Sequence, residues 1–309
     1  MKLSLCLATH NEEANIHYPL DSCIDFVDEV IIVDGRSSDK TVEIAKSYGS
    51  KVKVYVVDNP PMFHINKQKA LDLASGDWIL QLDADEEVSP ELAKEIRKVI
   101  GMTGRELREY ENDLPEKELF LRNENVIARI RQLAETKQSD SKKGGDRLLH
   151  PDLTVSRDDK EPIVAFYLPR LNYFLGRFLR YGGQYPDGSI RLVRKGKAHF
   201  PCKDVHEVMA VDGGTGWLQH PLLHYDSPTF GRYIERNNRY IDLMVRQYKE
   251  QKLEKNFLNF LNMVLLEPLL WFFGTQIGNK GVLDGWQGIV FSFFSALRFP
   301  RAYIKYLLK

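Results

Sequence analysis

The stretch GDWILQLDADEEVSPE, residues 76–91, decides the fold class. Its short apolar run at 78–82 predicts a buried strand, and two aspartates, Asp83 and Asp85, follow directly. Ser89 and Pro90 stand in the order that favours a helix start, with the cap residue first and proline in the first turn. The stretch therefore predicts a strand, an acidic turn and a helix in succession.

The same alternation extends outward from this stretch in both directions. Short apolar or β-branched runs predict further strands at Leu3–Thr9, Val30–Asp34, Val52–Val57, Tyr167–Phe174, Ser189–Val193 and Leu222–Tyr225. Helical spacing predicts helices at 12–26, 41–48, 65–75 and 229–250. Apolar strands that alternate with helices predict an α/β fold, in which a sheet has helices on both faces.

Composition excludes several classes of protein. The 309 residues contain 43 Lys+Arg and 43 Asp+Glu, so the formal net charge is zero and the chain is no general nucleic-acid binder. Hydrophobic content of 43% rules out a disordered chain. Three cysteines form neither a disulfide framework nor a zinc pattern, which favours a reducing cytoplasm. The apolar run that begins at Leu3 is too short for an export signal.

Two regions depart from the strand and helix alternation. Residues 101–161 hold 26 charged residues in 61 and predict a charged insertion, partly helical, for which a solvated face is the simplest interpretation. Residues 241–309 predict a C-terminal helical region that follows a domain at 1–240. Within this region 257–273 is strongly apolar, 289–299 is rich in Phe, and basic residues gather near the end. That pattern indicates a helix at the membrane surface, with a buried helical subdomain as the alternative.

The acidic residues at strand ends indicate the chemistry. Ligands of open α/β sheets bind at the carboxyl ends of strands, where Asp83 and Asp85 lie. Two neighbouring carboxylates favour a hard divalent cation such as Mg²⁺, which takes one or two carboxylates plus phosphate oxygens; solvated loop acids are the alternative. Asp34 ends the second strand and is suited to accept hydrogen bonds from a ribose or base. No glycine-rich turn follows the first strand at Thr9, which argues against a dinucleotide site.

Several segments together resemble the family-2 nucleotide-sugar glycosyltransferases. They are LSLCLATHNEEANI (3–16), VDEVIIVDGRSSDKTVEIAKSYGSKV (27–52), NKQKALDLASGDWILQLDADEEVSPEL (66–92) and RYGGQYPDGSIRLVRKGKAHF (180–200) with DVHE (204–207). HYDSPTFGRYIERNNRY (224–240) and the DGWQG…ALRF tail (284–299) are most similar to bacterial lipopolysaccharide-core β-glucosyltransferases. The insertion at 101–161 has no counterpart in this resemblance.

The resemblance implies a GT-A fold, that is, a Rossmann-like nucleotide-sugar-binding mixed sheet. It also implies a UDP-sugar donor, a Mg²⁺ or Mn²⁺ ion, no organic cofactor and inversion at the anomeric carbon. The donor-binding residues would be Thr9, Asn11, Glu12, Asp34, Lys67, Asp83 and Arg191. Asp85 would bind the metal and diphosphate, with Asp83 at the ribose or metal and His224 as a third metal ligand. A surface ion pair is the alternative role of Arg191.

The reaction also needs a base for the acceptor hydroxyl, because inversion by one displacement releases that proton. The resemblance assigns this role to Glu207, with Asp204 and Asp187 as runners-up. Tyr185 and Asp187 are predicted to bind the acceptor, the tyrosine by stacking on a sugar.

These predictions describe an inverting hexosyltransferase, peripheral at the cytoplasmic face of the cell membrane. It would move a hexose, for example glucose, from a UDP-sugar to a lipid-linked glycan such as the lipopolysaccharide inner core. The alternatives are a polyprenyl-phosphate or capsule glycosyltransferase and, in a different class, a non-catalytic membrane scaffold of a glycan-assembly complex. A nicotinamide dehydrogenase is the weakest alternative, since the glycine fingerprint is missing.

Overall fold

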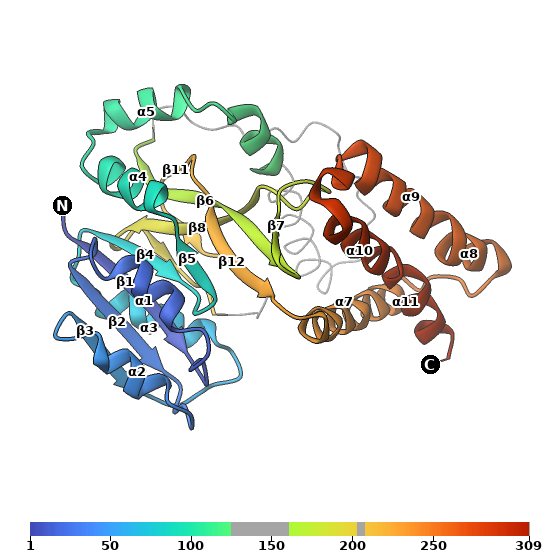
Figure 1. Ribbon diagram of the computed structural model, residues 1–309, viewed down its shortest axis with the longest axis horizontal. Coiled ribbons are helices and arrows are strands. Elements are labelled where there is room, and N and C mark those ends of the chain that lie inside the picture. Colours follow the sequence, from blue (N-terminus) through green and yellow to red (C-terminus); the bar gives the residue numbers. More distant parts are fainter. Residues whose placement is uncertain (125–160, 203–207, 309) are drawn as a thin grey trace, which may run out of the picture. The chain divides into compact units, whose positions relative to one another are not determined.

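The computed structural model describes residues 1–124, 161–202 and 208–308. The chain divides into two compact units (Figure 1). Unit 1 comprises Met1–Arg170 and Pro186–Leu222, and unit 2 comprises Leu171–Tyr185 and Leu223–Lys309. Strands β6 (Ile163–Phe174) and β12 (Leu222–Ser227) contribute residues to both.

Unit 1 is built on a mixed sheet. Strands β1 (Leu3–Thr9), β2 (Glu29–Asp34), β3 (Val52–Val56) and β4 (Trp78–Leu82) run parallel in the order β3-β2-β1-β4. Strand β8 (Asp187–Arg194) continues the sheet antiparallel to β4, and β6 lies antiparallel to β8. The predicted parallel strands are confirmed, and the antiparallel additions make the sheet mixed.

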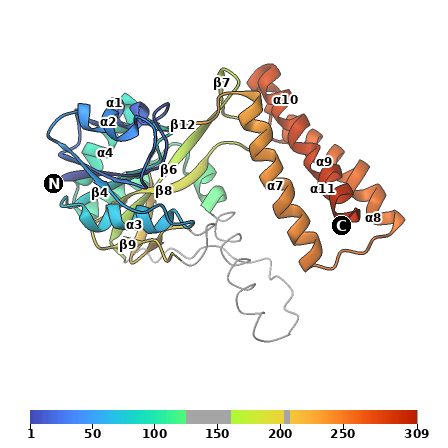
Figure 2. The same cartoon turned by 90° about the horizontal axis from the view of Figure 1, so that it is seen from below.

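Helices cover both faces of this sheet (Figures 1 and 2). Leu3, Leu5 and Leu7 of β1 pack into a core with α1 (His17–Cys23) and α4 (Pro90–Ile100). The side chain between them, Cys6, points to the other face and donates to the Ala70 carbonyl of α3 (His64–Leu73) at 3.2 Å. The alternation of side chains along a strand thus supplies both layers, and the predicted α/β fold class is confirmed.

The remaining elements of unit 1 are short. They are α2 (Thr41–Ser47), β5 (Glu86–Val88), α5 (Gly104–Asn112), β9 (Ala198–His199), β10 (Ala210–Val211) and β11 (Gly214–Trp217). The helix start predicted after residue 88 is confirmed, because the Ser89 side chain accepts a hydrogen bond from the Leu92 amide at 3.2 Å. The charged segment that begins at 101 contains α5 near its start. Thr103 and Glu106 form a capping box at the N-terminus of this helix.

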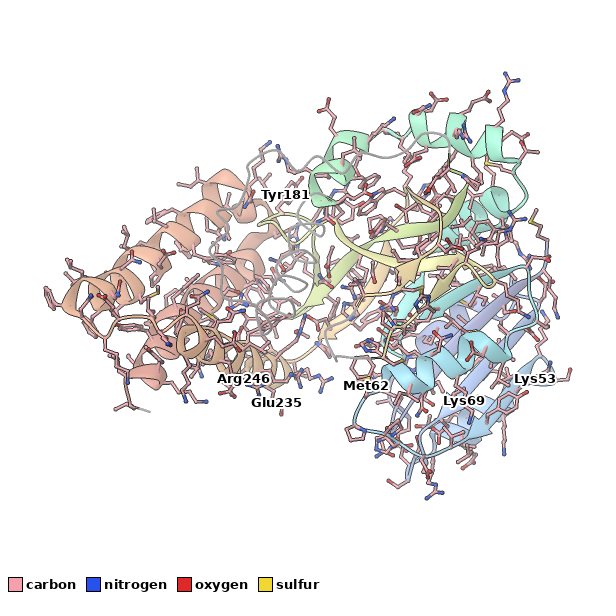
Figure 3. The ribbon with its side chains drawn as sticks, turned by 180° about the vertical axis from the view of Figure 1, so that it is seen from behind. Lys53, Met62, Lys69, Tyr181, Glu235 and Arg246 are labelled. Carbon is pink, nitrogen blue, oxygen red and sulfur yellow. The ribbon has the colours of Figure 1, made fainter. Side chains whose placement is uncertain are left out.

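Unit 2 is mostly helical and has its own core. Its long helix α7 (Phe230–Glu250) packs Ile241, Val245 and Tyr248 against Ala302 and Tyr303 of α11 (Arg298–Leu307). On the solvent side of α7, Glu235 and Arg246 are exposed (Figure 3). Unit 2 also contains strand β7 (Arg177–Leu179), which pairs antiparallel with the end of β6.

The C-terminal helices leave much apolar surface uncovered. The chain runs through α8 (Phe257–Leu261), η1 (Asn262–Leu266), α9 (Glu267–Phe273), η2 (Gly274–Gly278), η3 (Gly281–Asp284) and α10 (Gly285–Ala296) to α11. One helix, Phe257–Gly278, is long and apolar enough to cross a membrane by its 22 residues and mean hydropathy of 1.5. None of its most apolar window is buried, and Phe257, Leu258 and Ile277 are more than 70% exposed.

The domain boundary predicted at 240 falls inside the continuous helix α7. The compact units divide the chain after Arg170, Tyr185 and Leu222, so that all of α7 belongs to unit 2. The two-domain organisation itself stays a prediction.

Candidate functional site

The parallel strands of unit 1 bring three predicted residues to one edge of the sheet. Thr9 at the end of β1 lies opposite Asp34 at the end of β2, and Leu7 lies opposite Leu82 at the end of β4. Asp83 therefore follows β4 at the edge where Thr9 and Asp34 end their strands. This is the carboxyl edge at which open α/β sheets bind ligands.

Asp34 is fully buried and organises the loop that follows it. Its carboxylate accepts hydrogen bonds from the Thr9 hydroxyl at 3.0 Å and from the amide and hydroxyl of Ser37 at 2.8 Å and 2.5 Å. The amide of Gly35 in turn donates to the Thr9 carbonyl at 2.8 Å. Asp34 thus holds the ends of two strands together, and its direct contact with a nucleoside stays a prediction.

The loop after β1 is tied to the loop after β2. The side-chain oxygen of Asn11 accepts a hydrogen bond from the Ser38 backbone amide at 2.8 Å. The backbone amide of Asn11 donates to the Ser37 hydroxyl at 2.8 Å. Asn11 has a φ of 56°, a left-handed conformation that asparagine tolerates better than most residues. The Glu12 amide donates to the Thr41 hydroxyl at 2.8 Å. Thr9, Asn11 and Glu12 thus belong to one hydrogen-bonded loop pair at the site.

Asp83 is held between two cations. Its Oδ1 forms an ion pair with Lys67 of α3, and its Oδ2 lies 2.7 Å from Nη2 of Arg191 on β8. Both cations are buried, at 9% exposed for Lys67 and 5% for Arg191, while the Asp83 side chain stays 30% exposed. The predicted residues Lys67, Asp83 and Arg191 therefore meet, and Arg191 is no surface ion pair.

This arrangement fixes the charge of Asp83. Burial alone would raise the pKa of Asp83, but the charges of Arg191 and Lys67 outweigh burial and hold that pKa well below its ordinary value. Burial likewise acts to lower the pKa of Arg191, whereas the carboxylates of Asp83 and Glu86 raise it above its ordinary value. Asp83 is therefore a carboxylate near neutral pH, suited to accept hydrogen bonds and unable to give up a proton.

Three residues without a predicted role complete the network. Arg191 also donates to Gln81 at 2.6 Å and to Glu86 at 2.6 Å, and Glu86 accepts from the Asp83 amide at 2.9 Å. Arg170 of β6 lies 3.6 Å from Glu86. A signal for Gln81 was available, because it is the one polar residue of the run WILQL. Glu86 carried no comparable signal among the acids that surround it.

Asp187 and Asp85 lie in the same unit. Asp187, predicted to position the acceptor, pairs with Arg170 at 2.7 Å and its side chain is 42% exposed. Asp85, the predicted metal ligand, is partly exposed on the turn between β4 and β5. Within the described residues of each unit, no group of three or more His, Cys, Asp or Glu side chains is placed to hold a metal ion.

The other predicted residues lie elsewhere. Glu207, the predicted base, and its runner-up Asp204 fall outside the described residues. Tyr185 and His224 belong to unit 2. Tyr185 is buried with the Arg180 guanidinium over its ring at 4.7 Å, and Nδ1 of His224 lies 2.7 Å from Oδ1 of Asn172. Their roles toward an acceptor and a metal ion stay predictions.

Comparison with known proteins identifies the part of the chain that builds this edge. The sequence profile described as Glycosyl transferase family 2 matches residues 4–107, which contain β1 to β4, Asp34, Lys67, Asp83 and Asp85. Residues 4–107 belong to glycosyl transferase family 2. The predicted family is thereby confirmed for this domain.

Relatives agree with this assignment over different lengths. An uncharacterized glycosyltransferase of Rickettsia bellii is 42% identical over 101 residues, which are 32% of this chain and 33% of that protein. The match thus spans about a third of that relative's length. The lipopolysaccharide core biosynthesis glycosyltransferase LpsC of Rhizobium meliloti is 22% identical over 96% of this chain and 92% of its own.

Among solved structures, glucosyl-3-phosphoglycerate synthase from Mycobacterium tuberculosis, in complex with Mn²⁺ and UDP-glucose, is 29% identical. That similarity covers 28% of this chain and 34% of the synthase, with a TM-score of 0.25.

Proposed function

We propose that this protein is an inverting glycosyltransferase that moves a hexose from a UDP-sugar to a lipid-linked glycan, such as the lipopolysaccharide inner core. The observation that carries the proposal is the ionised Asp83, held by Lys67 and Arg191 at the carboxyl edge of a family 2 domain. The similarity to LpsC over most of the chain supports a lipopolysaccharide acceptor.

The donor would bind at the strand ends of unit 1. The fixed negative charge of Asp83 is suited to accept hydrogen bonds from ribose hydroxyls, and Thr9, Asn11 and Glu12 belong to the paired loops beside it. Because both oxygens of Asp83 already contact cations, Asp83 is better suited to the nucleoside than to a metal ion.

Asp85, at the carboxyl edge of the unit 1 sheet, is suited to bind a divalent cation. This carboxylate is partly exposed on the turn after β4, and Mg²⁺ or Mn²⁺ bound with a nucleotide needs only one or two protein carboxylates beside the phosphate oxygens. When bound, such an ion would neutralise negative charge on the departing diphosphate.

The proton of the acceptor hydroxyl has to leave as its oxygen bonds to the anomeric carbon and the bond to the diphosphate breaks. Asp83 cannot receive it, because its low pKa makes the carboxylate a poor base. We assign this role to Glu207. The exposed apolar helix Phe257–Gly278 supports a place at the inner face of the cell membrane, where a lipid-linked acceptor is held.

Two variants test this function. Transfer of labelled glucose from UDP-glucose to membrane lipid should fall at least about a hundredfold in Glu207→Gln, since a general base contributes about 10²–10⁴-fold. Asp85→Ala should abolish transfer, whereas the control Asp212→Asn, which loses an exposed ion pair with Lys197, should keep it. Normal turnover by Glu207→Gln would remove this residue as the base, and turnover by Asp85→Ala would remove the metal ligand.

Donor binding is tested separately by thermal unfolding with Mn²⁺ and a panel of nucleotide sugars. A true donor raises the melting temperature because it binds only the folded protein. A panel without any shift would contradict the transferase function and favour a non-catalytic scaffold.

A further inference from the structure

Unit 2 contains a cavity of about 230 Å³, several times the roughly 30 Å³ that a water molecule occupies. Its wall comes from the end of β6, from β7, Gln184 and β12, and from helices α7, α9, α10 and α11, all within this unit. None of its lining residues has a part in the proposed sugar transfer.

The first feature of the cavity is a guanidinium that carries its charge among aromatic rings. Arg298 lies 5.3 Å from the ring centre of Tyr240 and 6.0 Å from that of Trp271. Its Nε donates to the Ser295 carbonyl of the preceding turn at 3.1 Å, and no carboxylate among the described residues forms an ion pair with it. Burial lowers the pKa of Arg298, as expected for a cation with little compensation.

The other charges of the wall leave a single positive charge. Arg236 forms an ion pair with Asp226, and its guanidinium lies 5.8 Å from the Tyr240 ring. Arg236, Arg298 and Asp226 are the charged residues of the lining in the described part of the chain, so the net charge is +1. One negative charge would balance it.

The second feature is a buried amide. Asn237 is 3% exposed and lies in the stripe of α7 that otherwise buries Tyr233, Ile241 and Val245. The Asn237 side chain forms a hydrogen bond with the Tyr233 hydroxyl, and its Nδ2 has no other hydrogen-bond partner among the described residues. An amide NH₂ carries two donor hydrogens, so a bound oxygen acceptor would pair with the second one.

The third feature is the continuity of the cavity with exposed apolar surface. Trp271 lines the cavity and is itself 41% exposed on α9. Its helix neighbours Leu269, Leu270 and Phe273 are more than 50% exposed. A ligand whose head fills the cavity could therefore lay an apolar chain along α9.

We propose that this cavity binds the phosphodiester group of an anionic membrane lipid, with its acyl chains against α9. A phosphodiester carries one negative charge, which matches the net charge of the wall. Its oxygens would accept hydrogen bonds from the Arg298 guanidinium and the Asn237 amide. The inference goes beyond the proposed function, since it places a lipid site in unit 2 that does not depend on sugar transfer.

The full-length protein is titrated calorimetrically with dihexanoyl phosphatidylglycerol below its micelle concentration, and with inorganic phosphate. Wild-type protein should bind the lipid at least about tenfold more tightly than phosphate, because only the lipid also buries apolar surface. Equal affinity for the two would overturn the lipid assignment.

Two charge-conserving variants separate the cavity from general attraction to anions. Arg298→Lys should lower lipid affinity about tenfold, because lysine lacks the planar fork that binds two phosphate oxygens and stacks on rings. Arg301→Lys is the matched control on the same helix, since Arg301 bonds Asn238 at 2.7 Å and does not line the cavity. Equal losses in both variants would contradict the site.

A third variant protects the test from a folding defect. Asn237→Leu removes the buried amide while keeping a similar volume, so it should weaken lipid binding with little change in melting temperature, because the Tyr233 hydroxyl keeps its bonds to Phe291 and Ser295. Unchanged lipid affinity in this variant would count against the site. Stabilisation by the sugar donor should persist in all three variants, because the proposed donor-binding residues lie in unit 1. Failure of the lipid site and failure of the proposed function can therefore be told apart.

Discussion

Nη2 of Arg191 lies 2.7 Å from Oδ2 of Asp83, although the two residues are 108 positions apart in the chain. The contact exists because β8 pairs antiparallel with β4, with Leu192 opposite Leu80. The Arg191 guanidinium thereby holds the Asp83 carboxylate in its charged form and in place after β4.

Removing the Asp83 carboxylate should cost both stability and donor binding. Asp83→Asn leaves the buried Lys67 and Arg191 with less compensation, so we expect the free energy of unfolding to fall by about 1–3 kcal/mol. The stabilisation by UDP-sugar should disappear. Urea unfolding and thermal shift check this against Asp72→Asn, whose exposed carboxylate accepts a hydrogen bond from Gln68. A donor shift of wild-type size in Asp83→Asn would contradict the assigned role.

Lysine should not replace Arg191. The guanidinium contacts Gln81, Asp83 and Glu86 at once, and a single ammonium on a flexible stem does not reproduce that fork. We expect Arg191→Lys to lower the free energy of unfolding by about 1–3 kcal/mol. Arg194→Lys, on an exposed position of the same strand, should stay within about 0.5 kcal/mol. Equal stability of the two variants in urea would show that the network contributes little.

The pKa of Glu29 predicts how the free energy of unfolding depends on pH. Burial acts to raise its pKa, but hydrogen bonds from Ser4 and Ser75 and the nearby Lys53 outweigh this and lower the pKa from 4.5 to about 2. The group therefore stabilises the fold above pH 4.5, and this contribution is lost as the pH falls toward 2. We expect Glu29→Gln to lose about 2 kcal/mol at pH 7 and much less at pH 2–3.

Denaturant unfolding at both pH values measures this difference. Glu43→Gln, an exposed acid on α2, serves as the control. A deficit of Glu29→Gln that is the same at both pH values would show that the carboxylate charge is not its cause.

The cysteines should differ in reactivity. Burial raises the pKa of the Cys6 thiol far above its ordinary value and that of Cys23 to about 12, whereas Cys202 is partly exposed. Thiol reagents attack the thiolate, so only Cys202 should react quickly in the folded protein and all three after denaturation. Mass spectrometry after brief alkylation at pH 8 shows which cysteines have reacted. Early modification of Cys23 would contradict the buried core around α1.

Much of unit 1 follows from local patterns in the sequence. Buried strands such as Leu3–Thr9 are apolar throughout, and the cap at Ser89 is set by residues within one turn. Strand β5 carries no such signal, since two of its three residues are acidic and its burial depends on tertiary contacts. For the same reason, the joint contact of Lys67 and Arg191 with Asp83 was not predictable, although each residue was expected near the donor.

Unit 2 was harder to foresee. The resemblance covered residues 224–240, yet a sequence cannot tell that Asn237 is a buried polar residue of an apolar stripe until the partners of α7 are known. Composition alone predicts membrane contact for the apolar stretch 257–273, which lies within the exposed helix Phe257–Gly278. Its continuity with a charged cavity depends on Trp271, whose surroundings come from three different helices.

The uncovered helix Phe257–Gly278 decides how the protein has to be handled at the bench. Large exposed apolar patches drive self-association in water, so preparations made in plain buffer should elute from a sizing column as aggregates. A mild detergent or a nanodisc should return the chain to a defined particle. The transfer assays suggested above therefore start from protein kept in such a medium.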